Sequence, residues 1–173
     1  DAFSDLKAFL DGKKLDFKTY AFQGAFCENI KEIQKLIGND PAFCFVDPTG
    51  WKGAEMGCIK QLVNGQYRDV LINFMFDYVN RFVNHKEGSQ YEEMQKFFGA
   101  DVPEELDEEG LMKFYQDQLK ATCGLRYAAN LIVEDPLRDR TKFRLVVGGN
   151  HSSALKLFRD IEKRVVLSRQ PAI

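Results

Sequence analysis

AFCFVDPTGW, residues 42–51, is the stretch of sequence that decides the fold. It opens with a run of apolar residues, and such a short run of aromatic and β-branched residues is typical of a strand that is buried on both faces. Pro48 has no N–H group to donate to a neighbouring strand, so the strand ends at Asp47. In an open parallel sheet, ligands bind at the carboxyl ends of the strands. Asp47 is therefore expected at a functional edge and not in the core, while Cys44 and Phe45 are expected to be buried in a central strand.

Helical and strand-like patterns alternate around this stretch. The expected helices cover residues 3–10, 30–37, 56–63 and 76–83, and a final helix begins near Ser152, capped by that residue or by Asn150. The expected strands cover residues 15–22, 42–47 and 70–74, followed by an antiparallel hairpin of 128–133 and 143–147 with a polar connection at 135–140. Helices that alternate with strands are typical of βαβ units. The predicted fold class is α/β, with a mostly parallel sheet, helices on both faces and a terminal antiparallel hairpin at one edge.

Residues 87–121 differ from the rest of the chain because they are acidic and helical in pattern, with no strand. One interpretation is a helical insertion, or lid, within a single domain that spans residues 1–173. The other interpretation is a pair of solvated surface helices.

Composition limits the function classes. The chain has 173 residues, which suits one domain, and its net charge of -2 gives no general attraction to nucleic acid or to a membrane surface. No apolar run is long enough to span a bilayer, and no signal peptide opens the sequence. The four cysteines lack CxxC spacing, which favours reduced thiols in a cytoplasmic protein. With His85 and His151 also far apart, no metal site is expected.

Several motifs together resemble one known family. These are FVDPTGWKG at residues 45–53, VLINFM at 70–75, Asn80-Arg81-Phe82, and Asn150-His151 at the start of the last helix. They are similar to the three-Cys-motif partner family, and the likeness runs over most of residues 1–167. The resemblance implies a Rossmann-like, class I methyltransferase-type domain that uses S-adenosylmethionine. It also implies a partner, a three-cysteine-motif protein that resembles radical-SAM enzymes, in a mobile-element or defence system.

The chain departs from the family pattern at its beginning. The family's glycine-rich opening, which would hold the methionine part of S-adenosylmethionine, is absent from these residues, so the domain is expected to be partial and to start on the helix before the third strand. Gly24 and Phe26 then lie at the carboxyl end of that strand and become the expected cofactor contacts. This stretch lacks the acid that often contacts the adenine amine. We therefore expect these residues alone to bind S-adenosylmethionine weakly or not at all.

Asp47, Pro48 and Asn73 are the expected catalytic residues. Amino-group methyltransferases use a related Asp-Pro-Pro-aromatic corner, whose carboxylate and backbone carbonyl accept hydrogen bonds from the target amine and so place it. Asn73 lies at the end of the neighbouring strand and would lie beside Asp47, where it either orients the substrate or satisfies backbone groups. Trp51 would stack on a base. The alternatives are that Asp47 only caps the following turn and that Trp51 is buried under the helices that follow.

Three further residues are expected to bind substrate. Lys52 would contact a phosphate, Arg81 a phosphate or a carboxylate, and His151 would act as a general base near the start of the last helix. Each has a structural alternative: a solvated charge for Lys52, an ion pair for Arg81 and a capping or packing role for His151.

Two functions of different classes remain open from the sequence. The first is a methyltransferase-like domain that acts on nucleic acid or on a nucleotide-bearing substrate, with S-adenosylmethionine as donor. The second is a non-catalytic interaction module that binds a three-cysteine-motif partner or DNA. A nucleotide hydrolase is a weaker third, because the sequence has no Walker loop.

Overall fold

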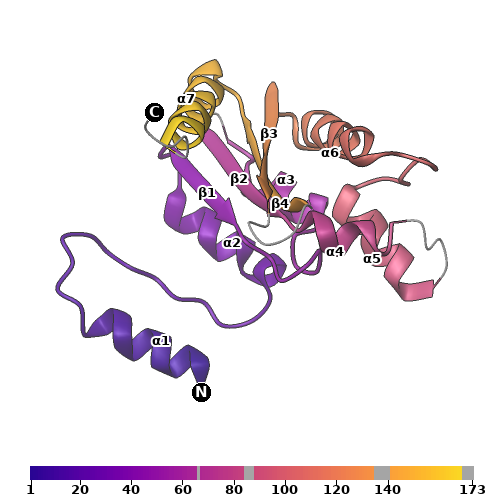
Figure 1. Ribbon diagram of the computed structural model, residues 1–173. Helices are drawn as coiled ribbons and strands as arrows, with labels where there is room; N and C mark the ends of the chain where they lie inside the picture. The colour runs from indigo at the N-terminus through magenta and orange to yellow at the C-terminus, as the bar shows by residue number, and fades with distance from the viewer. Residues whose placement is uncertain (66, 84–87, 135–140, 169–173) are drawn as a thin grey trace.

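The computed structural model describes residues 1–65, 67–83, 88–134 and 141–168 (Figure 1). His85 and the connection expected at 135–140 lie outside these residues. The strands are β1 (Ala42–Val46), β2 (Arg68–Phe74), β3 (Tyr127–Glu134) and β4 (Thr141–Gly149). The helices are α1 (Ala2–Asp11), α2 (Phe26–Ile37), α3 (Met56–Leu62), α4 (Phe76–Asn80), α5 (Gly88–Phe98), α6 (Glu108–Cys123) and α7 (Ser152–Ser168).

The four strands form one mixed sheet in the order β1-β2-β4-β3. β1 runs parallel to β2, but β4 is antiparallel to both β2 and β3. The predicted mostly parallel, Rossmann-like methyltransferase-type sheet is therefore wrong, since β1 and β2 are the one parallel pair among the described strands. The physical reason is that the expected strand at residues 15–22 does not form, so β1 gains no parallel neighbour on its outer side. The antiparallel hairpin of β3 and β4 at one sheet edge is confirmed.

β1 is an edge strand, which contradicts the prediction of a central strand buried on both faces. Cys44 and Val46 point into the core, but Phe43 and Phe45 are 65% and 57% exposed. Successive side chains of a strand point to opposite faces. At β1 only one of those faces is covered, so a continuous apolar run did not guarantee burial on both sides.

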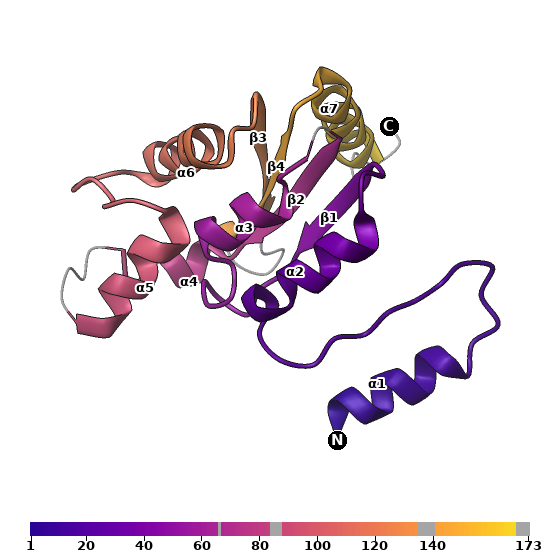
Figure 2. The same cartoon turned by 180° about the vertical axis from the view of Figure 1, so that it is seen from behind.

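The main core lies on one face of the sheet and includes side chains from α3 to α6. α5 and α6, which cover most of the acidic segment, bury Met94, Phe97, Leu111 and Tyr115 there. They are therefore part of the core and not a pair of solvated surface helices. α7 packs on the opposite face, where Phe158 contacts a smaller cluster from β3 and β4 (Figures 1 and 2).

The N-terminal arm, residues 1–25, stands apart from this body (Figures 1 and 2). The helix expected near residues 3–10 is confirmed as α1, yet it buries no residue. Residues 15–22 have no regular structure, and Phe17 is 68% exposed. The alternation of apolar and polar residues predicted a strand here, but a strand also needs a neighbour to pair with.

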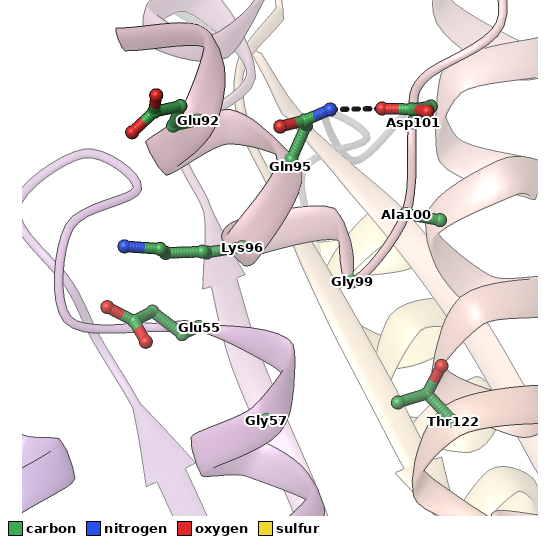
Figure 3. Close-up of a pocket in the computed structure, with 9 residues that line it drawn as sticks. All are labelled: Glu55, Gly57, Glu92, Gln95, Lys96, Gly99, Ala100, Asp101 and Thr122. Atoms are coloured by element: carbon green, nitrogen blue, oxygen red, sulfur yellow. Dashed lines mark hydrogen bonds between the residues drawn. The ribbon is translucent and has the colours of Figure 1, made fainter. Parts of the chain in front are cut away.

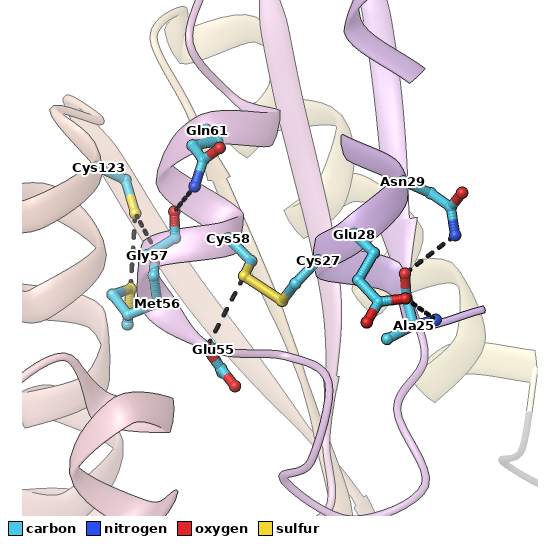
Figure 4. The surroundings of a disulfide bond; sticks show 10 residues. All are labelled: Ala25, Cys27, Glu28, Asn29, Glu55, Met56, Gly57, Cys58, Gln61 and Cys123. Atoms are coloured by element: carbon cyan, nitrogen blue, oxygen red, sulfur yellow. Dashed lines mark hydrogen bonds between the residues drawn. A yellow bond between two sulfur atoms is a disulfide. The ribbon is translucent and has the colours of Figure 1, made fainter. Parts of the chain in front are cut away.

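A disulfide joins Cys27 at the start of α2 to Cys58 at the start of α3 (Figure 4). The prediction of four reduced cysteines is therefore wrong, and only Cys44 and Cys123 are free. The expectation of a cytoplasmic protein rested on reduced thiols and loses that support. Separately, among the described residues no helix is both long and apolar enough to cross a membrane.

Candidate functional site

Asp47 and Asn73 come together at the carboxyl ends of two adjacent strands. Val46 pairs with Ile72 in the parallel register of β1 and β2, so the residues that follow each of them emerge side by side. Asn73 Nδ2 donates a hydrogen bond to Asp47 Oδ1 at 2.7 Å. The expected convergence of these two side chains is confirmed, while their role in catalysis stays a prediction. Asp47 is an exposed residue, so a ligand can reach its carboxylate.

The hydrogen bond fixes the orientation of the Asn73 amide. An ionised carboxylate only accepts hydrogen bonds, so Asn73 must turn its NH₂ group toward Asp47. Its Oδ1 atom is then buried and has no hydrogen-bond partner among the described residues. An unpaired buried acceptor costs about 1–3 kcal/mol, and such groups in a folded protein call for an explanation, of which a functional role is one.

Trp51 lies near this site in sequence but is buried, with only 2% of its surface exposed. Its ring packs against Tyr78 and Phe82 at centroid distances of 4.8 and 5.2 Å, and its Nε1 donates to Glu93 at 3.4 Å. Gly50 permits this packing, because its φ is +89° and an added Cβ would lie 2.8 Å from Tyr78. Trp51 is therefore part of the interior wall and presents no free face to a base.

The two cations expected to bind substrate already have carboxylate partners. Lys52 Nζ lies 3.1 Å from Glu93 Oε1, and Arg81 Nη2 lies 2.8 Å from Asp77 Oδ2. Both cations are well exposed, so these pairs contribute little to stability and can reopen for a ligand.

His151 lies at the other end of the sheet, near the start of β2. Gly148 of β4 pairs with Val70, which places the chain after β4 beside the amino end of β2. His151 Nδ1 accepts a hydrogen bond from the Ser153 N–H at 3.2 Å, so the side chain caps α7. It also acts on Asp69: burial raises the pKa of Asp69, and the charge of His151 opposes that rise. The structure therefore does not bring His151 to Asp47 and Asn73.

Gly24 and Phe26 belong to the turn that starts α2. Gly24 has a φ of +104°, and the N–H of Ala25 donates to Glu28 Oε2 at 3.3 Å. The Glu28 carboxylate thus occupies the place where a helix N-terminus would receive an anion. This turn does not fit the carboxylate end of S-adenosylmethionine, and no step through that cofactor is derived from it.

A cavity of about 740 Å³ between α3, α5 and α6 was not foreseen from the sequence. Its lining residues are Glu55, Gly57, Glu92, Gln95, Lys96, Gly99, Ala100, Asp101 and Thr122 (Figure 3). Gln95 hydrogen-bonds to Asp101 across one side of it. The i,i+4 spacing of Glu92 and Lys96 indicates from the sequence that these two side chains share one face of a helix.

Comparison with known proteins gave no assignment. No protein-family model matches the chain, and no curated protein or solved structure matches it significantly.

Proposed function

We propose that this chain acts on an amino group of nucleic acid or of another nucleotide-bearing substrate, as a methyltransferase does, with Asp47 accepting a hydrogen bond from that group and Asn73 positioning Asp47. The observation that supports this is the Asn73–Asp47 hydrogen bond at the ends of β1 and β2. S-adenosylmethionine is the donor implied by the family resemblance. Because the turn at Gly24 and Phe26 does not fit that cofactor, the proposal concerns the binding of the amino group.

The hydrogen-bonded pair leaves one carboxylate oxygen of Asp47 free to accept a hydrogen bond. Asn73 engages Asp47 Oδ1, which leaves the other carboxylate oxygen of this exposed residue to accept a further hydrogen bond. An exocyclic amino group of adenine or cytosine is a hydrogen-bond donor and is complementary to such an acceptor. Pro48 follows directly and has no N–H group that would compete for the carboxylate. Asp47 therefore accepts the amine, and Asn73 positions Asp47.

The experiment compares ligands that differ only in the amino group. Adenosine monophosphate and inosine monophosphate, and likewise cytidine and uridine monophosphates, are titrated against the full chain. We expect the amino-bearing member of each pair to bind more tightly, and Asp47→Asn to remove that preference. Asp40→Asn is the matched control, because Asp40 is also exposed and precedes the opposite end of β1. Equal binding of both members of each pair by the wild type would overturn the proposal.

Transfer of labelled methyl from S-adenosylmethionine to DNA, RNA and these nucleotides is measured beside the titrations. If transfer is detected, Asp47→Asn should lower it about 100-fold, since misplacement of a reacting group by about 1 Å has that effect. A melting curve for each variant separates loss of placement from loss of fold.

The alternative function is a non-catalytic module that binds a three-cysteine-motif partner or DNA. The observation in its favour is the large exposed apolar surface of the N-terminal arm, where Leu6, Phe9 and Phe17 face solvent. Under this reading the partner still binds after Asp47→Asn, and removal of residues 1–25 abolishes binding. No methyl transfer is then seen even with the wild type.

A further inference from the structure

We propose that Cys27, Cys58 and Glu55 form a redox-controlled site for a thiophilic divalent cation of the Zn²⁺ class. The site is closed while the two cysteines form their disulfide and opens when that bond is reduced. This inference does not depend on the role of Asp47 and Asn73.

The three side chains already converge. The two sulfur atoms and a carboxylate oxygen of Glu55 all lie within 4.8 Å of one another. Glu55 and Cys58 come from the start of α3, and Cys27 comes from the start of α2, which packs beside it (Figure 4). Glu55 Oε2 lies 3.9 Å from the sulfur of Cys58. Two neighbouring helices thus supply three ligand atoms that become available together once the sulfur–sulfur bond is broken.

The chemistry of this set matches a specific class of metal. Zn²⁺ binds cysteine sulfur at about 2.3 Å and carboxylate oxygen at about 2.0–2.2 Å, usually with four ligands in a tetrahedron. Thiolates select Zn²⁺ over Mg²⁺ and Ca²⁺, which prefer oxygen ligands. Cys27 is the second residue of the twelve-residue helix α2, where the positive end of the helix dipole stabilises a thiolate. Two thiolates and one carboxylate leave the fourth position for water.

The site is reachable because Glu55 also lines the cavity between α3, α5 and α6 (Figure 3). Glu92 and Lys96 line the same cavity, so its wall carries one acidic and one basic side chain beside Glu55 (Figure 3). A metal ion can therefore approach the Glu55 carboxylate from solvent.

The switching steps balance in atoms and electrons. A dithiol reductant gives two electrons and two protons to the Cys27–Cys58 bond and becomes a disulfide itself, which leaves two free thiols. Binding of Zn²⁺ then displaces the two thiol protons to solvent. When a small-molecule disulfide takes two electrons from the two thiolates, the Cys27–Cys58 bond forms again, the small disulfide becomes two thiols with two protons from solvent, and the metal ion is released.

The test uses the full chain in its oxidised and reduced forms, with Co²⁺ as a spectroscopic probe and Zn²⁺ as competitor. We expect the reduced chain to bind one equivalent of Co²⁺ with thiolate-to-cobalt charge-transfer absorption, which Zn²⁺ abolishes. The oxidised chain should give no such absorption. Binding of Co²⁺ by both forms alike, or by neither form, would overturn the proposal. Circular dichroism monitors the fold during reduction, and a disulfide that is reduced only when the chain unfolds would also overturn it.

Variants identify the ligands. Cys27→Ser and Cys58→Ser should each remove the charge-transfer signal of a two-thiolate site, whereas Cys44→Ser and Cys123→Ser should leave it unchanged. Glu55→Gln leaves the cysteines in place and should weaken Zn²⁺ binding at least about tenfold, the loss typical of even an indirect partner of a metal ligand. If Cys44→Ser or Cys123→Ser removes the signal instead, the site lies elsewhere and the assignment is wrong.

Discussion

The N-terminal arm and the segment from α5 to α6 carry the same number of aromatic residues and use them in opposite ways. The arm has Phe3, Phe9, Phe17, Tyr20 and Phe22, and residues 88–123 have Tyr91, Phe97, Phe98, Phe114 and Tyr115. In the second region, Phe97, Phe98 and Tyr115 are almost fully buried against Phe74 of β2. In the arm, by contrast, α1 buries nothing. Aromatic content therefore does not locate a core, because burial also needs a facing surface.

The largest effect is expected from a truncation in the buried region. Phe97 has ring contacts with Phe74, Phe98 and Tyr115 at centroid distances of 5.2 to 5.4 Å. Phe97→Ala should lower the free energy of unfolding by about 3–5 kcal/mol, since it removes buried surface and leaves a cavity. Phe17→Ala is the matched control in the arm and should change it by less than about 0.5 kcal/mol. Urea denaturation measures both, and equal losses would show that the arm is packed in solution.

The next effect concerns the ion pairs that tie α6 to the sheet. Arg144 of β4 is 3% exposed and donates to Glu108 at 2.8 Å, to Glu109 at 2.6 Å and to Asn130 at 2.7 Å. Burial lowers the pKa of Arg144, but its bonds to the two glutamates outweigh this and raise it. Arg144→Met should cost about 2 kcal/mol, less than a fully buried pair, because both glutamates reach solvent.

Glu109→Gln serves as the control for that variant, since the Glu109 side chain is 70% exposed. It should cost at most about 1 kcal/mol, the usual range for a solvent-exposed ion pair. A larger loss for Glu109→Gln than for Arg144→Met, measured by urea denaturation, would contradict the assigned role of Arg144.

A smaller effect is expected from pH, through the Cys123 thiol where α6 meets α3. Burial raises the pKa of the Cys123 thiol from 9.0 to about 11, although the charge of Lys60 opposes the shift. The folded chain then prefers the protonated thiol. Its contribution to the free energy of unfolding is complete below pH 9 and is lost as pH rises toward 11. We expect a loss on the order of 1 kcal/mol, discounted for the partial exposure of the thiol. Denaturation at pH 8 and pH 11 should show a weaker pH dependence for Cys123→Ala than for the wild type.

The smallest effect is a gain in stability. The hydroxyl of Tyr115 is buried and has no hydrogen-bond partner among the described residues. Tyr115→Phe removes this unpaired group and keeps the ring contacts of the aromatic cluster. The variant should be as stable as the wild type or more stable by up to about 1 kcal/mol. A clear loss of stability on urea denaturation would mean that the hydroxyl has a partner in solution, such as a buried water.

Local signals in the sequence predicted much of the fold. The turn after Val46, the apolar run of β2 and the alternation in β3 and β4 each depend on neighbours in the chain. All four strands of the described sheet were located correctly from them. The pairing pattern was not predictable in the same way. Residues 15–22 have the alternation of a strand, but nothing in their own sequence says whether a partner strand is present.

The candidate site shows the same division between local and distant information. Asp47 and Asn73 could be placed together because each lies at the carboxyl end of a predicted strand, and the ends of parallel neighbours meet. The burial of Trp51 depends on Tyr78, Phe82 and Glu93, which are distant in sequence. The meeting of Cys27 with Cys58 depends on how α2 packs beside α3, so spacing alone suggested four separate thiols.

The strand order also determines when each strand can pair while the chain is being synthesised. β2 finishes at Phe74, yet the strand that pairs with its free side is β4, whose Arg144 lies opposite Phe74. At about 5–20 residues per second, a ribosome needs roughly 4–15 seconds to make the chain between them. During that interval α5 and α6 emerge and can cover one face of β2, while the edge of β2 that will pair with β4 stays without a partner strand. The nascent chain is therefore most exposed to wrong strand pairing while the residues between β2 and β4 are being made.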